Sequence, residues 1–133
     1  MILKLANALD VNALLYTSNF SDELYHSLVK KFNKYSEENN LDISLIINTI
    51  TGPSNVTAQN EFILNLFKKK SNKYDLYFYD NIYSANYGDY FLDLNEYLPK
   101  SHLNIFNYDI ISNSCIYNDK LIGLVIIRYT FII

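Results

Sequence analysis

Hydrophobic and polar residues alternate over the first eighty positions in a way that predicts a repeated order of strands and helices. Short apolar runs predict strands at Val11–Tyr16, Asp42–Ile50 and Tyr74–Tyr79. Between them, apolar residues recur at helical spacing in Leu24–Tyr35 and Thr57–Lys70. Strand, helix, strand, helix, strand with short connections predicts an α/β fold: a three-layer arrangement with a parallel sheet and flanking helices.

The pattern changes after the third predicted strand. The apolar run stops at Asp80-Asn81, and a turn and an aromatic loop follow it. Near the end of the chain, Ile116–Leu124 contains two apolar runs joined by the polar residues Asn118-Asp119-Lys120. Two such runs with a short polar connection predict a β-hairpin.

Composition and charge narrow the function classes. The 133 residues suffice for one hydrophobic core, and half of them are hydrophobic, which is typical of a globular domain. The formal net charge of −3 provides no basic surface for nucleic acid. With only three glycines, the chain has no glycine-rich phosphate loop, so we expect no nucleotide and no other cofactor.

The reactive residue types are isolated from one another. His26 and His102 lie far apart and lack neighbours at metal-ligand spacing, which argues against a zinc site. Cys115 is the single cysteine, and we expect a buried, inert thiol. Asp75 and Asp93 are expected to make structural hydrogen bonds, and no nucleophile elbow is visible. We therefore expect that this chain is not an enzyme.

Both ends of the sequence are expected to be truncated. Residues 1–8 end in the small-residue pattern Ala6-Asn7-Ala8, and we interpret them as a signal-peptide remnant; residues 9–133 form the predicted domain. The apolar run at the far end is too short, and is interrupted by Arg128, to span a bilayer. Sequons at Asn19 and Asn55 predict N-glycosylation sites, which suits an extracellular protein.

The order of segments resembles a known family. The segments that carry the likeness are Leu15-Tyr16-Thr17-Ser18-Asn19, Leu28–Asn33, Ile43–Ile50, Lys73–Asp80, Phe91–Pro99 and Ile116–Leu124. Their order resembles the N-terminal lobe of an extracellular (periplasmic) solute-binding protein of the sugar-binding family 1 type, with a type 2 periplasmic-binding fold. The chain departs from that pattern at Asp119, where the family has Gly, and at Val125, where it has Pro.

The resemblance implies a carbohydrate-binding or similar solute-binding module, like the substrate-binding proteins of ABC transporters. The family's second lobe and hinge are absent from this sequence, so we expect a truncated N-terminal lobe that binds a sugar weakly by itself. Its partner would be a small polar solute, with a missing second lobe or a membrane protein as a further partner. The alternatives are a piece of the ectodomain of a class C receptor-like membrane protein, a non-binding interaction fragment and, more remotely, an enzyme with a flavodoxin-like sheet.

Polar residues that follow the three predicted strands are the candidate ligand-binding residues. In open α/β sheets, ligands bind at the carboxyl ends of the strands. Asn and Asp suit sugar hydroxyls, and Tyr offers an apolar face with a polar tip. The alternative role for each is to cap a helix or a turn. The candidates are Thr17, Ser18, Asn19, Ser54, Asn55, Asp80, Asn81 and Tyr83.

Overall fold

The most deeply buried apolar run of the chain forms the central strand of its main sheet. Ala13, Leu14 and Leu15 in β1 (Leu9–Thr17) are all buried. The structure is a computed structural model that describes residues 8–17, 23–53 and 55–125. It divides into two compact units, Met1–Tyr79 and Asp80–Ile133, here called the first and the second unit.

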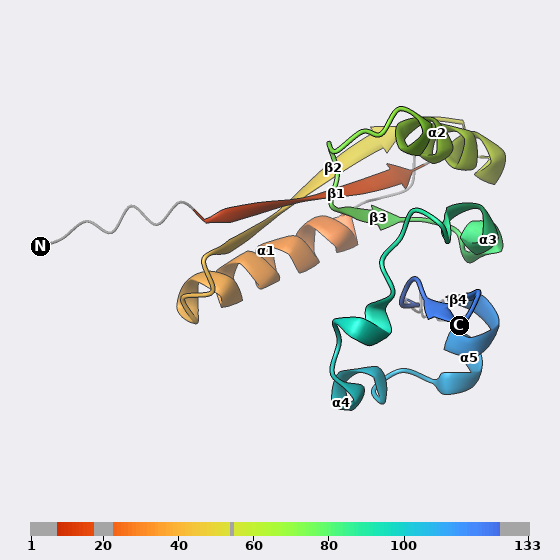
Figure 1. Ribbon diagram of the computed structural model, residues 1–133. Helices are drawn as coiled ribbons and strands as arrows, with labels where there is room; N and C mark the ends of the chain where they lie inside the picture. The colour runs from red at the N-terminus through yellow and green to blue at the C-terminus, as the bar shows by residue number, and fades with distance from the viewer. Residues whose placement is uncertain (1–7, 18–22, 54, 126–133) are drawn as a thin grey trace, which may run out of the picture. The chain divides into compact units, whose positions relative to one another are not determined.

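The first unit holds the main sheet and both long helices (Figure 1). Strand β1 lies between the other two strands, and both pairings are parallel. The register places Thr17 beside Thr51 and Leu15 beside Phe78, so the three carboxyl ends lie at one edge of the sheet. After β1, the elements are α1 (Glu23–Glu38), β2 (Ile43–Thr51), α2 (Val56–Lys68) and β3 (Leu76–Phe78).

The two helices cover opposite faces of this sheet. On one face, the rings of Phe62 and Phe67 in α2 lie 6.1 Å from Tyr16 and 5.0 Å from Tyr77. On the other face, Tyr25 of α1 contacts Phe78 with ring centroids 5.2 Å apart. Because β2 and β3 flank β1 on opposite sides, crossovers of the same hand require helices on opposite faces. The predicted parallel sheet with flanking helices is therefore confirmed.

Polar residues of α1 pack against the edge of β2. Asn33 donates a hydrogen bond through Nδ2 to the Leu45 carbonyl (2.9 Å) and accepts one at Oδ1 from the Leu45 N–H (2.8 Å). Ser36, which is buried, donates through Oγ to the Ile43 carbonyl (2.6 Å) and accepts from the Ile43 N–H (3.3 Å). The helix side chains thus satisfy backbone groups that an edge strand otherwise leaves unpaired.

This packing corrects the predicted apolar face of α1. Leu24, Leu28 and Tyr35 are exposed, although their helical spacing predicts burial. In the C-terminal half of α1, which includes Tyr35, the physical reason is the strand edge, because an apolar side chain there would leave polar backbone groups of β2 without partners. Asn33 and Ser36 occupy those positions instead.

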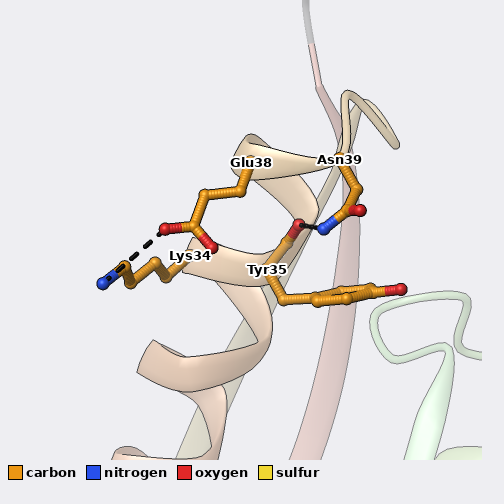
Figure 2. Close-up of polar contacts among 4 residues, drawn as sticks. All are labelled: Lys34, Tyr35, Glu38 and Asn39. Atoms are coloured by element: carbon orange, nitrogen blue, oxygen red, sulfur yellow. Dashed lines mark hydrogen bonds and ion pairs between the residues drawn. The ribbon is translucent and has the colours of Figure 1, made fainter.

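The far side of α1 carries polar contacts at the surface. The Lys34 Nζ atom lies 3.6 Å from Oε1 of Glu38, and Asn39 donates through Nδ2 to the Tyr35 carbonyl at 2.8 Å. Figure 2 shows both contacts. The Lys34 and Glu38 side chains are 75% and 60% exposed, and the basic residue precedes the acidic one. Exposed pairs in this order stabilise a helix by at most about 0.5 kcal/mol.

Both long helices end in the same backbone motif. The Leu41 N–H donates to the Ser36 carbonyl (3.0 Å), and the Ser71 N–H donates to the Leu66 carbonyl (3.0 Å). The residue before each donor has a positive φ, 52° at Asn40 and 51° at Lys70. This is the Schellman motif, in which a left-handed residue reverses the chain. The left-handed residue of this motif is usually Gly, but here it is Asn40 after α1 and Lys70 after α2.

The described part of the second unit, residues 80–125, contains only short elements. Its contacts include a buried cluster of Ile111, Cys115 and Leu121, against which Leu94 and Phe106 pack. A two-residue turn with positive φ at Asn118 (47°) and Asp119 (63°) joins its two strands, as in a type I′ turn, so the predicted hairpin is confirmed. In order, its elements are η1 (Asn81–Tyr83), α3 (Ser84–Tyr87), η2 (Leu94–Glu96), α4 (Lys100–Leu103), α5 (Tyr108–Ser114), β4 (Ile116–Tyr117) and β5 (Lys120–Leu121).

Most predicted element bounds in the first unit agree with the structure within about three residues. The third strand is shorter than predicted and covers only Leu76–Phe78 of Tyr74–Tyr79. The backbone N–H of Asp75 donates to the Asn12 carbonyl (2.7 Å), and the Asp75 carboxylate accepts from the Asn12 N–H (2.8 Å). The carboxylate thus accepts a hydrogen bond from a backbone N–H of β1, close to the first residue of β3. The predicted structural role of Asp75 is confirmed.

Candidate functional site

The carboxyl ends of β1, β2 and β3 form the candidate site, here called the rim of the first unit. Thr17 ends β1 and is partly buried, and its carbonyl accepts a hydrogen bond from the Gly52 N–H at 3.2 Å. Thr51 ends β2 and is exposed. The parallel pairing brings these residues to one edge of the sheet, as predicted from the order of elements.

Asn55 caps α2 at this rim. Its Oδ1 accepts a hydrogen bond from the Ala58 N–H at 2.6 Å, and the residue is exposed. The cap uses the carbonyl oxygen of the side chain, because only that atom accepts from a backbone N–H. The amide group of Asn55 is not needed for the cap and suits a ligand hydroxyl.

Three other candidates belong to the second unit. Asp80 caps η1 by accepting a hydrogen bond at Oδ1 from the Ile82 N–H (3.1 Å). Asn81 is exposed and Tyr83 is partly buried, and both lie within η1. The capping alternative thus describes Asp80 as well as Asn55.

The remaining candidates lie outside the described residues. They are Ser18, Asn19 and Ser54, so the sequon at Asn19 is also outside that range. Residues 1–7 of the interpreted signal-peptide remnant lie outside it too. Glycosylation at Asn55 stays a prediction on an exposed side chain.

Tyr16 and Gln59 are rim residues that sequence reasoning missed. A Cβ built on Gly52 would lie 1.9 Å from the Tyr16 hydroxyl, so the tyrosine occupies the space that Gly52 leaves open. Gln59 of α2 donates through Nε2 to the Phe78 carbonyl at 3.1 Å and thereby joins the helix to the end of β3. The one available signal was the glycine directly after the second predicted strand.

Two titratable groups away from the rim are shifted by their surroundings. Burial raises the pKa of the Tyr77 phenol, and the nearby Tyr74 and Asp75 raise it further. Burial also raises the pKa of the Cys115 thiol, which disfavours the reactive thiolate. The predicted buried thiol is therefore confirmed.

Neither a metal-ligand cluster nor a membrane-spanning helix occurs among the described residues. Within residues 8–17, 23–53 and 55–125, no three His, Cys, Asp or Glu side chains gather as a metal site requires. None of the helices that the structure describes combines the length and the hydrophobicity that a bilayer crossing requires.

Comparison with known proteins adds no family. No protein-family model and no curated protein matches the chain. The likeness to sugar-binding proteins therefore stays a prediction from the order of motifs.

Proposed function

We propose that the rim of the first unit binds a small polar solute, such as a sugar, as the N-terminal lobe of an extracellular solute-binding protein. The observation that carries the proposal is the parallel register of β1, β2 and β3, which gathers three strand ends at one edge. Helix α1 follows β1 on one face of the sheet and α2 follows β2 on the other face. Ligands of open α/β sheets bind where neighbouring connections leave toward opposite faces in this way.

The rim offers chemistry that fits a hydroxyl-rich ligand. Thr17 and Thr51 each carry a hydroxyl that donates and accepts, and the Asn55 amide adds a donor beyond the cap. Tyr16 adds an aromatic ring at the end of β1. The proposal assigns no catalytic step to the chain.

A titration followed by NMR tests the proposal on the full chain. Monosaccharides and disaccharides are added to the ¹⁵N-labelled protein, up to about 50 mM because a single lobe buries little of a ligand. We expect shifts in the amide signals of Thr17, Thr51 and Asn55. Shifts confined to the second unit, or none with any sugar, would contradict solute binding at this rim.

A matched pair of cap variants separates binding from folding. Asn55→Asp keeps the carbonyl-like acceptor of the cap and removes the amide donor, so we expect affinity to fall about tenfold with an unchanged melting temperature. Asn107→Asp is the control, because Asn107 caps α5 through Oδ1 to the Asp109 N–H (2.9 Å) in the second unit. Equal effects of the two variants on affinity would argue against a ligand contact at Asn55.

A further inference from the structure

Among the described strands, β2 lies at one edge of the main sheet. The strand order is β2-β1-β3, so only one side of β2 pairs with β1. The backbone groups of Asp42 and Gly52 point toward β1, since the Leu9 N–H donates to the Asp42 carbonyl and the Gly52 N–H donates to the Thr17 carbonyl. Backbone groups of successive strand residues point to alternate sides. The odd-numbered residues of β2 therefore direct their N–H and C=O groups outward.

Helix α1 satisfies only the first half of this edge. Its C-terminal half bonds the outward groups of Ile43 and Leu45 through Ser36 and Asn33. Its N-terminal half lies at the other side of the sheet, where Tyr25 contacts Phe78 of β3. The helix thus crosses the sheet and does not follow β2 to its end (Figure 1).

The second half of the edge, Ile47–Thr51, is here called the free edge. By the same alternation, Ile47, Thr49 and Thr51 direct their backbone groups outward. No described residue bonds these outward groups. The Thr49 Oγ1 atom is also buried without a hydrogen-bond partner in the described part of the chain. Unpaired strand edges of this kind are templates for another strand.

The opposite edge of the sheet is protected differently. Strand β3 has only three residues, and Gln59 bonds the Phe78 carbonyl at 3.1 Å. A very short edge strand with a capped carbonyl offers little to an incoming strand. Among the described strands of this sheet, the free edge of β2 is therefore the place where the sheet can grow.

We propose that the free edges of two copies of this chain pair antiparallel about a two-fold axis at Thr49. Ile47 then lies opposite the partner's Thr51, and Thr49 lies opposite the partner's Thr49. The segment carries no charge and no proline, so its self-pairing meets no like-charge repulsion. A two-fold contact uses the same surface on both copies and closes as a dimer.

Structural stops on both sides fix the length of the pairing. On one side, Asn33 already occupies the outward groups of Leu45. On the other side, Pro53 follows two residues after the strand and has no N–H to donate. Centring on Thr49 uses the whole segment between these stops. It also places the two Thr49 side chains together, where a rotation about χ1 lets one hydroxyl bond the other.

The dimer is expected to be weak. The paired segments are short, and small interfaces bind with dissociation constants on the order of 100 µM. Analytical ultracentrifugation of the full chain, from about 10 µM to about 1 mM, covers that range. We expect the mass to rise from monomer toward dimer over this series and to stop there.

Two pairs of variants test the register. Thr49→Pro removes an outward N–H and leaves the bonds to β1 intact, so we expect a monomer throughout the series, whereas Thr49→Val keeps the N–H and the dimer. Thr51→Lys adds a charge to the edge without changing the backbone, and we again expect a monomer. Asn65→Lys adds the same charge at an exposed position of α2 and is expected to leave the dimer unchanged. Circular dichroism checks that each variant is folded.

Three outcomes would overturn the dimer. The first is a wild-type chain that stays monomeric at about 1 mM, where a contact of this affinity would be largely formed. The second is a dimer that persists in Thr51→Lys. The third is slow hydrogen exchange at the amides of Ile47, Thr49 and Thr51 in monomeric protein, because another part of the chain would then cover the edge.

Discussion

Different kinds of contact stabilise the interior of the first unit and the interior of the second unit. The first unit rests on two strands of nine residues in continuous register, with a helix on each face. The second unit has no strand longer than two residues among those described, and single side chains bond its backbone at many points. Asp80, Asp93 and Asn107 each cap a short helix, and Ser84 donates through Oγ to the Ser114 carbonyl at 2.8 Å. A long run of repeated backbone hydrogen bonds therefore stabilises the first unit, whereas hydrogen bonds from individual side chains stabilise the second.

The largest expected effect lies in the second unit, at Gly88. A Cβ there would lie 2.0 Å from Cδ1 and 2.3 Å from Cγ of the Tyr117 ring, and the glycine is buried. Because these are the atoms at the base of the ring, the side chain cannot swing away from them. We expect Gly88→Ala to destabilise the second unit by about 3 kcal/mol, as in overpacked cores. Hydrogen exchange measured by mass spectrometry reports the loss for each unit separately.

Gly52→Ala is the matched control in the first unit. The nearest atom to its Cβ would be the Tyr16 hydroxyl, at the far end of a side chain that can turn aside. We expect a loss of about 1 kcal/mol, confined to the first unit. If Gly52→Ala were as costly as Gly88→Ala, the contrast between the units would be wrong.

The next effect concerns the strand edge beside α1. Asn33→Ala leaves the outward N–H and carbonyl of Leu45 without their partner, which costs about 2 kcal/mol for partly buried groups. Urea denaturation of the variant measures this loss. Glu38→Gln is the control from the exposed side of the same helix, where we expect a change below about 0.5 kcal/mol (Figure 2). A similar cost for both variants would show that Asn33 acts as an ordinary surface residue.

The comparison of Asn33 with the rest of the first unit distinguishes the features that hydrophobic periodicity predicts from those that it does not. The strands and long helices of the first unit follow from their apolar spacing, because burial on a face is repeated along each element. The position of Asn33 does not, since its role depends on a strand edge formed by residues distant in sequence. Helices α3 and α5 escape prediction because they are too short for a repeated apolar spacing. Two buried residues and no side-chain cap mark α3, and one cap and one buried residue mark α5.

The candidate site divides in the same way. The common edge of the strand ends was predictable, since parallel strands leave their carboxyl ends on one side. Whether Asn55 or Asp80 caps a helix was not, because the same side chain suits a cap and a ligand. The packing of Tyr16 over Gly52 is a contact between neighbouring strands of the folded sheet. The glycine at position 52 is its only indication in the sequence.

A smaller effect, dependent on pH, is expected at Asp93. Its carboxylate accepts hydrogen bonds from the Asn95 N–H and from the Leu121 N–H (both 3.0 Å), so it joins η2 to the hairpin and its predicted structural role is confirmed. The Asn95 N–H is the largest cause that lowers the pKa of Asp93 below its ordinary value of 3.8, and Leu121, the Asn95 side chain and Lys120 add to it against desolvation.

The sign of the pH effect follows from that lowered pKa. The charged form is favoured in the folded state, so its stabilising contribution is complete above the ordinary value of 3.8 and is lost as the pH falls through the lower folded pKa. We expect the unfolding free energy of the second unit to fall in that range. Asp93→Asn, which keeps an oxygen acceptor but does not titrate, is expected to flatten the profile. An unchanged profile would assign the pH dependence to other carboxylates.

The smallest expected effect is a gain in stability at the hairpin turn. Asp119 adopts a φ of 63°, at the second turn position, where a side chain costs energy that Gly avoids. We expect Asp119→Gly to stabilise the second unit by about 0.5 kcal/mol, measured by hydrogen exchange at the Leu121 amide. Lys70→Gly is the counterpart in the first unit, since Lys70 has a φ of 51° in the Schellman motif of α2. Each variant should stabilise its own unit alone. A gain shared by both units would show that they unfold together, and the division at Tyr79 would then have no energetic meaning.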